Sequence, residues 1–490
     1  LKQMEARSEP MLRALLADPR LAVRPVVWRR ALPRLLRLLV FSGIPLRILA
    51  AWLAPAAARA SLDRLGQDLR SASTAPANAT AAERLALAER LLLTWPARIF
   101  PQAVGPVIAG LGSFAIAERL LAGLASPDER DAIKRALPRN PTTEMDLALG
   151  ALARQAGAQA AARAALQEQS PSSLAAAYRS GALPAELQRG LSRFLEQYGH
   201  RAVAEIDLGM PRWSDDPAPL LATLASQLKM PESAAPDVQF RASAAQADAM
   251  VRELAQRAAR RGQLRGLAVR VLLGRGRALA GLREMPKFLI VLLIARARAL
   301  ILSVGEELAR TGRLAAADDI FFLTLPEARE VLQTDGRNAR AVVRERRARY
   351  ADELGRRHLP RLLRSDGTEP ELEVAPVGAP GEILRGVPAS AGQVTGRARV
   401  ILDPAEARLE PGEILVAPST DPGWTPLFLT ASGLVMEMGG AMSHGAVVAR
   451  EYGIPAVVGV PEATERITDG QEVTVDGTAG VVIIATAESA

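Results

Sequence analysis

The chain has 490 residues, of which 49% are hydrophobic and 23% are charged, and its formal net charge is +8. This length exceeds one ordinary hydrophobic core, so two or three domains are expected, and the hydrophobic content excludes a wholly disordered chain. The chain has no cysteine, which excludes disulfides, thiolate nucleophiles and cysteine metal sites. This composition fits a reducing compartment, so we expect a cytoplasmic location.

The charged residues argue against a nucleic-acid partner. Arginine supplies nearly all of the positive charge, and it is spread along the chain among acidic residues instead of forming one basic tract. A membrane partner is not expected either. The apolar runs at residues 38–49 and 288–295 are both shorter than the roughly 20 apolar residues of a membrane-spanning helix. We interpret both runs as buried helices.

Residues 1–365 have a helical pattern, in which apolar residues recur three and four positions apart and alanine, leucine and arginine dominate. Thr80 followed by Glu83 is the capping-box pattern that begins a helix. Breaks between helices are predicted at residues 71–78, 138–141, 171 and 211–219. We therefore predict a large, mostly α-helical region, in one or two lobes.

The pattern changes near residue 384. Residues 366–383 are predicted to be a linker, because this part of the chain is rich in proline, glycine and acidic residues and has no sustained period. In residues 384–490, the segment 393–402 alternates like a strand, and 413–417, 433–436 and 456–459 are short apolar segments typical of strands. Residues 472–475 and 481–484 flank Asp476-Gly477 and are predicted to form a closing hairpin. The predicted fold class is multidomain, α plus α/β, with a β/β/α domain after the helical region.

His444 is one of three histidines, and it stands at the start of a predicted helix in the segment GGAMSHGAVVAREYG, residues 439–453. A helix N-terminus presents free N–H groups and the positive end of the helix dipole, so it favours a phosphoryl group. A neutral imidazole is a competent nucleophile near pH 7, and Gly439 and Gly440 let the backbone approach a bulky anion. These features fit a transiently phosphorylated histidine. The alternative is a histidine that only caps the helix or fills a pocket.

Four segments occur in order around this histidine: DPGWTPL (421–427), GLVMEMGG (433–440), SHG (443–445) and VAREYGIP (448–455). Together they resemble the swivelling phosphohistidine domain of the phosphoenolpyruvate-utilising enzymes over residues 386–484. The resemblance implies that His444 carries a phosphoryl group between two distant active sites. It also implies a phosphoryl-binding loop made of Gly439, Gly440, Ser443 and Gly445. Met442 stands where some members have threonine, and Ser443 is a candidate to supply the missing hydroxyl.

The domain order narrows the resemblance. Members that use phosphoenolpyruvate have a large barrel after the histidine domain, whereas here the histidine domain comes last, behind a helical region, as in the rifampicin phosphotransferases. Three segments of the helical region look like blocks of that group, YGHRAVAEIDL (198–208), LREMPKF (282–288) and DDIFFLTL (318–325). The resemblance implies a phosphotransferase in which the helical region binds a lipophilic, rifampicin-like acceptor.

Arg283 and Lys287 lie four residues apart, so they share one helix face if Pro286 permits a turn there. A guanidinium and an ammonium together are suited to hold a phosphoryl group as it leaves His444 for an acceptor hydroxyl. The resemblance implies this catalytic role for the pair. The alternative is an ordinary solvated helix face.

Other polar residues are weaker candidates for a functional site. His200, Arg201, Glu205 and Asp207 form a candidate second polar site, and the alternative is a buried cluster that joins helices. His358 lies at an arginine-rich helix end and is expected to be solvated. No spacing of His, Asp and Glu indicates a metal site. The acidic pairs at residues 215–216 and 318–319 are interpreted as acids at helix starts.

A phosphoryl donor site is not recognisable. Residues 1–365 contain no glycine-rich phosphate loop and no lysine-bearing strand. The resemblance implies that ATP and Mg²⁺ bind to a separate domain, and because the chain begins at Leu1, we expect a piece of a longer protein or one part of a split enzyme. The expected function is transfer of an ATP-derived phosphoryl group through His444. The alternatives are transfer to a small metabolite, and a non-enzymatic phosphocarrier or regulatory module.

Overall fold

The computed structural model describes residues 43–228, 235–334, 337–354, 383–402, 409–420, 424–428, 430–440 and 443–485. The contacts between residues divide the chain into two compact units. Among the described residues, the first unit contains 67–96 and 293–354, and the second contains 43–66, 97–292 and 383–485. The predicted linker at 366–383 lies outside the described residues, apart from its last position.

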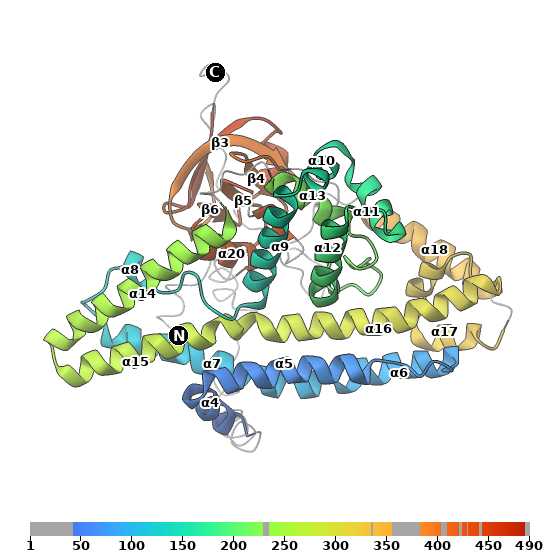
Figure 1. Cartoon of the computed structure of the whole chain (residues 1–490), viewed down its shortest axis with the longest axis horizontal. Coiled ribbons are helices and arrows are strands. Elements are labelled where there is room, and N and C mark those ends of the chain that lie inside the picture. Colours follow the sequence, from blue (N-terminus) through green and yellow to red (C-terminus); the bar gives the residue numbers. More distant parts are fainter. Residues whose placement is uncertain are drawn as a thin grey trace, which may run out of the picture. The chain divides into compact units, whose positions relative to one another are not determined.

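The described residues are mostly helical up to residue 354 and form a mixed sheet after residue 382, as predicted (Figure 1). The α-helices are α4 (Ile44–Leu53), α5 (Pro55–Ala72), α6 (Ala81–Thr94), α7 (Pro96–Leu120), α8 (Pro127–Ala132), α9 (Pro141–Gly157), α10 (Ala160–Glu168), α11 (Pro171–Ser180), α12 (Ala185–Tyr198), α13 (Ala218–Gln227), α14 (Pro236–Arg260), α15 (Gln263–Ala280), α16 (Met285–Arg310), α17 (Leu325–Val331) and α18 (Arg337–Leu354). Two 3-10 helices, η2 (Gly281–Glu284) and η3 (Ala317–Phe322), precede α16 and α17.

The local signals for helix starts and breaks are confirmed. The Thr80 hydroxyl accepts a hydrogen bond from the backbone N–H of Glu83 at 3.3 Å, and the Glu83 carboxylate accepts one from the N–H of Thr80 at 2.8 Å. This is the predicted capping box at the start of α6. Each predicted break coincides with a gap between helices, after α5 and before α9, α11 and α13.

The two apolar runs behave differently. Residues 288–295 lie in α16, where Leu289, Val291 and Leu293 are buried, as predicted. The prediction of a buried helix at 38–49 is wrong for the part that is described, because α4 leaves Leu46 73% exposed and Leu49 54% exposed. One side of α4 packs against the rest of the second unit. There, the Trp52 indole N–H donates to the Ser113 hydroxyl of α7 at 3.1 Å.

Two longer helical stretches have the length and composition of a membrane span, residues 81–120 and 263–310, with mean hydropathies of 1.6 and 2.2 in their most apolar windows. The protein itself buries 44% and 56% of these windows. Core helices of soluble proteins meet the same criteria, so the prediction that no membrane is involved stays a prediction.

The first unit is joined by ion pairs as well as by apolar contacts. Arg346 of α18 donates to both carboxylate oxygens of Glu327 at the start of α17, at 2.7 and 2.8 Å. These hydrogen bonds, with that from the N–H of Thr324, lower the pKa of Glu327 to about 2. Arg84 of α6 pairs with Glu307 of α16 at 2.5 Å.

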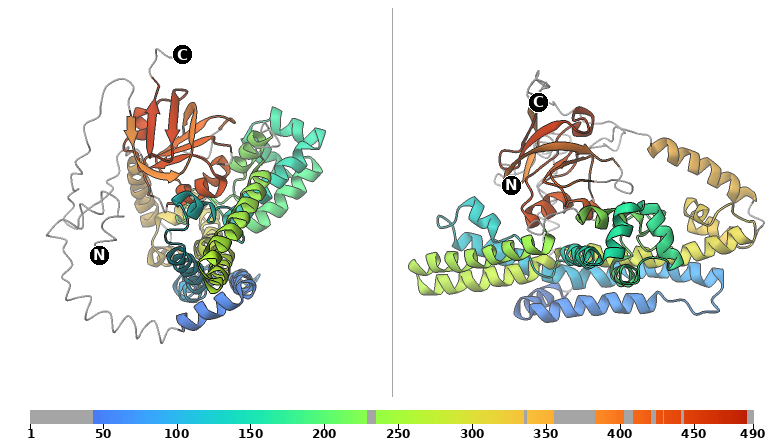
Figure 2. Two further views of the ribbon diagram at one scale, coloured as in Figure 1. Left: turned by 90° about the vertical axis from the view of Figure 1, so that its left-hand side faces the viewer. Right: turned by 45° about the horizontal axis from the view of Figure 1, so that its top comes forward.

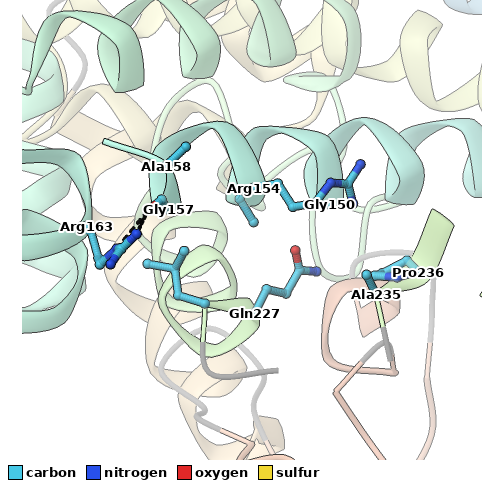
Figure 3. Close-up of a pocket in the computed structure, with 10 residues that line it drawn as sticks. Gly150, Arg154, Gly157, Ala158, Arg163, Gln227, Ala235 and Pro236 are labelled. Atoms are coloured by element: carbon cyan, nitrogen blue, oxygen red, sulfur yellow. Dashed lines mark hydrogen bonds between the residues drawn. The ribbon is translucent and has the colours of Figure 1, made fainter. Parts of the chain in front are cut away.

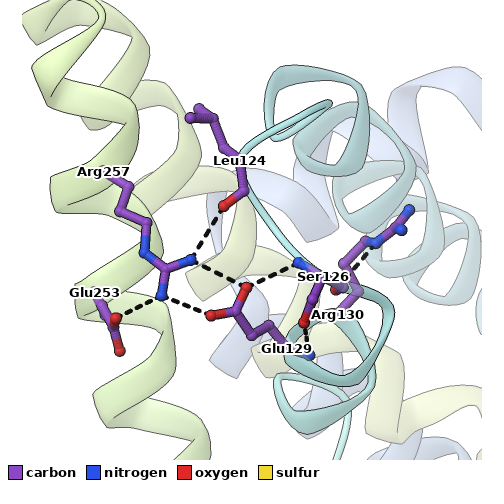
Figure 4. A network of polar contacts seen from close by, with 6 residues as sticks. All are labelled: Leu124, Ser126, Glu129, Arg130, Glu253 and Arg257. Atoms are coloured by element: carbon purple, nitrogen blue, oxygen red, sulfur yellow. Dashed lines mark hydrogen bonds and ion pairs between the residues drawn. The ribbon is translucent and has the colours of Figure 1, made fainter.

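In the second unit, α14 and α15 pack side by side as a hairpin (Figure 1). Buried residues of α7, α14 and α15 form one apolar core, and those of α9 to α13 form another, which includes Trp213. Figure 4 shows how Arg257 of α14 ties this hairpin to α8. Its guanidinium donates to Glu129 at 2.6 and 3.0 Å and to the carbonyl of Leu124 at 3.1 Å.

The sheet of the second unit has eight strands in the order β1-β8-β7-β3-β4-β5-β6-β2. Figure 2 shows this sheet, in orange and red, from two further sides. The strands are β1 (Ile383–Arg385), β2 (Val387–Ser390), β3 (Gln393–Val400), β4 (Ile414–Ala417), β5 (Gly433–Met436), β6 (Ala456–Val458), β7 (Glu472–Asp476) and β8 (Val481–Ile484). Strands β3 to β6 are parallel and the other pairs are antiparallel. All six strand segments predicted from the sequence are confirmed, with ends that move by up to two residues.

Strands β4, β5 and β6 are buried on both faces, which explains their unbroken apolar sequences. In β4, Leu415 and Ala417 belong to the core under α20 (His444–Tyr452) and α19 (Thr425–Phe428), while Ile414 and Val416 face the opposite core. Strand β5 ends at Met436, and the chain enters α20 a few residues later. The N-terminus of α20 therefore lies beyond the carboxyl end of a parallel strand, a common place for ligands in α/β folds.

Candidate functional site

One hydroxyl group beside His444, at the start of α20, has no hydrogen-bond partner within the described residues. Ser443 is the N-cap of α20, but its side chain makes no capping hydrogen bond. Its hydroxyl oxygen is buried and has no hydrogen-bond partner within the described part of the chain. A buried hydroxyl without a partner costs free energy, on the order of 1–3 kcal/mol, unless a ligand or a water satisfies it. The local geometry therefore favours a polar ligand at this point.

The glycines of the predicted phosphoryl-binding loop differ in what the local structure requires of them. Gly439 has φ of 122°, a conformation that favours glycine, and a Cβ there would lie 3.0 Å from the Ser443 hydroxyl. The Gly440 carbonyl accepts a hydrogen bond from the N–H of Ser443 at 2.8 Å. A Cβ at Gly445 would lie 2.5 Å from the Met436 sulfur, so this glycine lets α20 pack closely on β5.

The His444 side chain is partly buried, with its ring 6.4 Å from that of Phe428. Burial lowers the pKa of His444 well below its ordinary value of 6.5, and the positive charges of Lys287, Arg201 and Arg283 lower this pKa further. The imidazole is therefore neutral near pH 7. A neutral imidazole has a lone pair that can attack phosphorus.

Arg283 and Lys287 reach this region from the start of α16. Arg283 lies in η2, and Lys287 lies in the first turn of α16, where Pro286 costs no helical hydrogen bond. The Arg283 guanidinium lies 3.3 Å from a carboxylate oxygen of Glu451, and the Lys287 ammonium lies 3.3 Å from a carboxylate oxygen of Glu205. Each of these two cations is thus paired with a carboxylate, and the positive charge of each lowers the pKa of His444.

The candidate second polar site adjoins the first. The Arg201 guanidinium pairs with Glu205 at 2.8 Å, and both side chains are at most 2% exposed. Glu205 thus joins Arg201 to Lys287. The His200 ring packs edge-on against Phe288 at 4.7 Å between centroids, one position after Lys287. Asp207 lies at the rim, where its carboxylate accepts from the N–H of Gly209 at 2.6 Å. The sequence did not indicate that these groups meet.

Sequence reasoning missed Glu451, which lies seven residues after His444 on nearly the same face of α20. Its carboxylate is 4% exposed and accepts hydrogen bonds from Asn140 at 2.9 and 3.0 Å and from Thr143 at 2.7 Å. Burial raises the pKa of Glu451, while the charge of Arg283 acts in the opposite direction. The available signal was that Glu451 is the one acid in the segment 444–452, HGAVVAREY.

Two pockets lie in the helical part of the second unit. One has a volume of about 400 Å³ and is lined by Ala204, Glu205, Ile206, Asp207 and Lys287. The other, of about 430 Å³, is bounded by α9, α10, α13 and the start of α14 (Figure 3). The first pocket includes Lys287, so it is the candidate acceptor site.

The remaining site predictions have mixed outcomes. Asp216 and Asp319 accept backbone hydrogen bonds at the starts of α13 and η3, as expected for acids at helix starts. No cluster of three or more His, Asp or Glu side chains suited to a metal occurs within the described ranges, and the prediction of no metal site stays a prediction. His358 and Met442 lie outside the described residues.

The comparisons with known proteins fit this arrangement. Residues 409–480 match the family described as PEP-utilising enzyme, mobile domain. Residues 102–284 match the family described as rifampicin phosphotransferase fourth domain. The first region contains His444 and Glu451, and the second contains Arg201, Glu205 and Arg283. Two successive parts of the chain are thus similar to a rifampicin phosphotransferase domain and to the mobile domain of the phosphoenolpyruvate-utilising enzymes.

Relatives of known name support the same resemblance. The chain is 40% identical to a rifampicin phosphotransferase of Streptomyces sviceus over 301 residues, which is 61% of this chain and 34% of the relative. It is 33% identical to one of Bacillus cereus over 384 residues, which is 78% of this chain and 44% of the relative. The aligned part thus spans less than half of these relatives. The resemblance to rifampicin phosphotransferases that the sequence motifs indicated is confirmed.

Proposed function

We propose that this chain performs the transfer part of a phosphotransferase reaction, in which His444 carries an ATP-derived phosphoryl group to a hydroxyl of a lipophilic, rifampicin-like acceptor. The main support is the convergence of three cations on a neutral histidine. Lys287, Arg201 and Arg283 all act on the pKa of His444, and an unpartnered hydroxyl lies next to it at the start of α20. A dianionic phosphoryl group on the imidazole would be attracted by these positive charges and could accept a hydrogen bond from the Ser443 hydroxyl.

The transfer step needs only groups that this chain contains and an acceptor hydroxyl. The bond between phosphorus and the imidazole nitrogen breaks, and a bond between phosphorus and the acceptor oxygen forms. The proton of the hydroxyl passes to the imidazole nitrogen that the phosphoryl group has left. Lys287, Arg283 and Arg201 stabilise the negative charge on the phosphoryl oxygens during transfer. His444 itself therefore serves as the final proton acceptor.

The loading step needs ATP and Mg²⁺, and we place their binding site in a separate ATP-binding domain. The aligned part of this chain spans 34% and 44% of the two relatives, so these relatives have ample length for such a domain. When bound, ATP supplies the phosphoryl group and Mg²⁺ neutralises its phosphate charges. The role of His444 in the loading step is to present a neutral imidazole nitrogen to the phosphoryl donor.

The acceptor is proposed from the relatives and from the pocket beside Lys287. Glu205 and Asp207 line this pocket together with Ala204 and Ile206, so acids and apolar groups surround the cation. Two carboxylates disfavour an anionic small metabolite such as pyruvate and permit an uncharged hydroxyl. The named relatives are rifampicin phosphotransferases, which makes rifampicin the first acceptor to test.

The test is a single-turnover transfer. The purified chain is phosphorylated with phosphoramidate, a small phosphoryl donor, the reagent is removed, and rifampicin or pyruvate is added. We expect mass spectrometry to find phosphorylated rifampicin with the wild-type chain and with His358→Asn, and none with His444→Asn. Transfer to pyruvate but not to rifampicin would contradict the proposed acceptor. Transfer by His444→Asn would contradict the proposed carrier.

A further inference from the structure

Glu451 links the helix of the reactive histidine to the helical part of the second unit. It lies near the end of α20, whereas Asn140 and Thr143 lie at the start of α9, about 300 residues earlier in the chain. Asn140 donates to both carboxylate oxygens, and Thr143 donates to one of them. Arg283 approaches the other oxygen at 3.3 Å. Four hydrogen bonds from three side chains thus converge on one carboxylate.

A second polar contact lies next to the first. The Tyr452 hydroxyl donates to the Asp146 carboxylate at 3.2 Å, one turn along α9 from Thr143. Both groups are buried, and burial raises the pKa of Asp146 well above its ordinary value. Two neighbouring buried polar contacts therefore join α20 to α9.

A buried acid is a costly way to join two elements permanently. Removing a carboxylate from water is unfavourable unless its partners replace the lost hydration, whereas apolar side chains of similar size often join buried surfaces at least as well. The contact of Glu451 is favourable only while Asn140, Thr143 and Arg283 all hold their positions. A carboxylate that separates from these partners is hydrated again, which offsets part of the cost of breaking the contact.

Arg283 couples this contact to the reactive centre. Its guanidinium pairs with Glu451 and also acts on the pKa of His444. Glu451 therefore fixes two things together, namely the place of α20 against α9 and the place of one cation beside the imidazole.

We propose that Glu451 is a positioning residue for phosphoryl delivery, which holds α20 against α9 so that His444 faces Lys287, Arg283 and Arg201. The contact is needed while His444 delivers its phosphoryl group and is not needed while His444 is loaded. The proposal rests on the proposed function and adds to it the contact that defines the delivery position.

The contact can be tested by exchanging its two polar partners. Asn140→Asp keeps the oxygen that accepts the N–H of Thr142 at the start of α9, but it places a second acid against Glu451. The double variant Asn140→Asp with Glu451→Gln restores one amide and one carboxylate at exchanged positions. Glu472→Ala, at an exposed position of β7, is the matched control.

The first measurement is the distance between spin labels in the intact chain. Because the chain has no cysteine, single cysteines at the exposed positions Ser172 and Ala479 can be labelled without side reactions. We expect one main distance in the wild-type chain and in Glu472→Ala. In Asn140→Asp, the population at this distance should fall about tenfold relative to the separated state, and the double variant should recover most of it.

The second measurement separates delivery from loading. Phosphorylation of His444 by phosphoramidate should proceed at the wild-type rate in Asn140→Asp, while transfer from His444 to rifampicin should slow about tenfold and recover in the double variant. The proposal is overturned if Asn140→Asp changes neither the distance between the spin labels nor the rate of transfer to rifampicin. It is also overturned if the double variant restores neither of them. If the wild-type chain is loaded but never delivers, while the distances still respond to the exchange, the proposed function fails and the contact stands.

Discussion

At the scale of single residues, the proposed phosphoryl transfer depends on whether the imidazole of His444 is charged. Burial, followed by Lys287, Arg201 and Arg283, lowers the pKa of His444 well below 6.5. Protonation removes the nucleophilic lone pair, so the rate of loading should stay constant as the pH falls to 6.5 and should decline only near the lowered pKa.

An NMR titration of the histidine rings tests this prediction, because the chain has only three histidines and His444→Asn assigns the signal. Lys287→Ala removes one neighbouring cation and should raise the pKa of His444 towards 6.5. Titration of His444 at or above 6.5 in the wild-type chain would contradict the described surroundings.

Lys287 should contribute to delivery far more than an ordinary surface lysine. Replacing a cation that stabilises the transferring phosphoryl group should slow delivery by about 10² or more. Lys287→Ala should therefore lose transfer to rifampicin in single-turnover assays. Lys134→Ala removes an ion pair with Glu118 on the surface and serves as the control, with delivery unchanged. Equal rates for the two variants would remove Lys287 from the catalytic role.

The sequence indicated the candidate site residues, but it did not indicate which residues contact them. The motif around His444 and the spacing of Arg283 and Lys287 could be recognised because they are local. The contacts of Glu205 with Lys287 and of Glu451 with Asn140 join residues 82 and 311 positions apart. No pattern within one segment could predict such pairs, because they depend on how helices pack.

At the scale of elements, the close packing of α20 on β5 depends on Gly445. A Cβ at this position would meet the Met436 sulfur at 2.5 Å and the Thr420 hydroxyl at 2.6 Å. Gly445→Ala should therefore lower the free energy of unfolding of the sheet region by about 1–3 kcal/mol, measured by urea denaturation.

The control for this variant is Gly274→Ala in α15, where a Cβ would meet no atom within 4 Å. Alanine is the better helix former, so this change should be neutral or stabilising by up to about 1 kcal/mol. If Gly445→Ala were as stable as Gly274→Ala, the packing of α20 on β5 would have to be looser than described.

Strand β3 was predictable from its alternating pattern, and β4, β5 and β6 were predictable because each is a short apolar run bounded by glycine, proline or acids. Strands β1 and β2 were not, because they have only 3 and 4 residues, and Gly386 and Pro388 interrupt their pattern. The exposure of α4 could not be predicted either, since an apolar helix gives no sign of which neighbours cover it.

At the scale of the whole molecule, the grouping of residues by contacts differs from the predicted domains. The histidine-bearing sheet shares a unit with residues 97–292, because α20 makes its polar contacts with α9 and Arg283. The predicted boundaries at 365 and 383 stay a prediction, as does the swivelling of the histidine domain. Lys287 of the candidate catalytic pair and Arg201 of the candidate second polar site meet at Glu205, and all three residues lie in this unit.

The central claim is that His444 is the phosphoryl carrier, and its most direct test is to locate the phosphoryl group and follow its departure. The chain is phosphorylated with phosphoramidate, digested at neutral pH and mapped by mass spectrometry before and after addition of rifampicin. The account predicts an acid-labile phosphate on the peptide of His444 that disappears when the acceptor is added. A phosphate that persists on His444, or a transferable phosphate in His444→Asn, would contradict it.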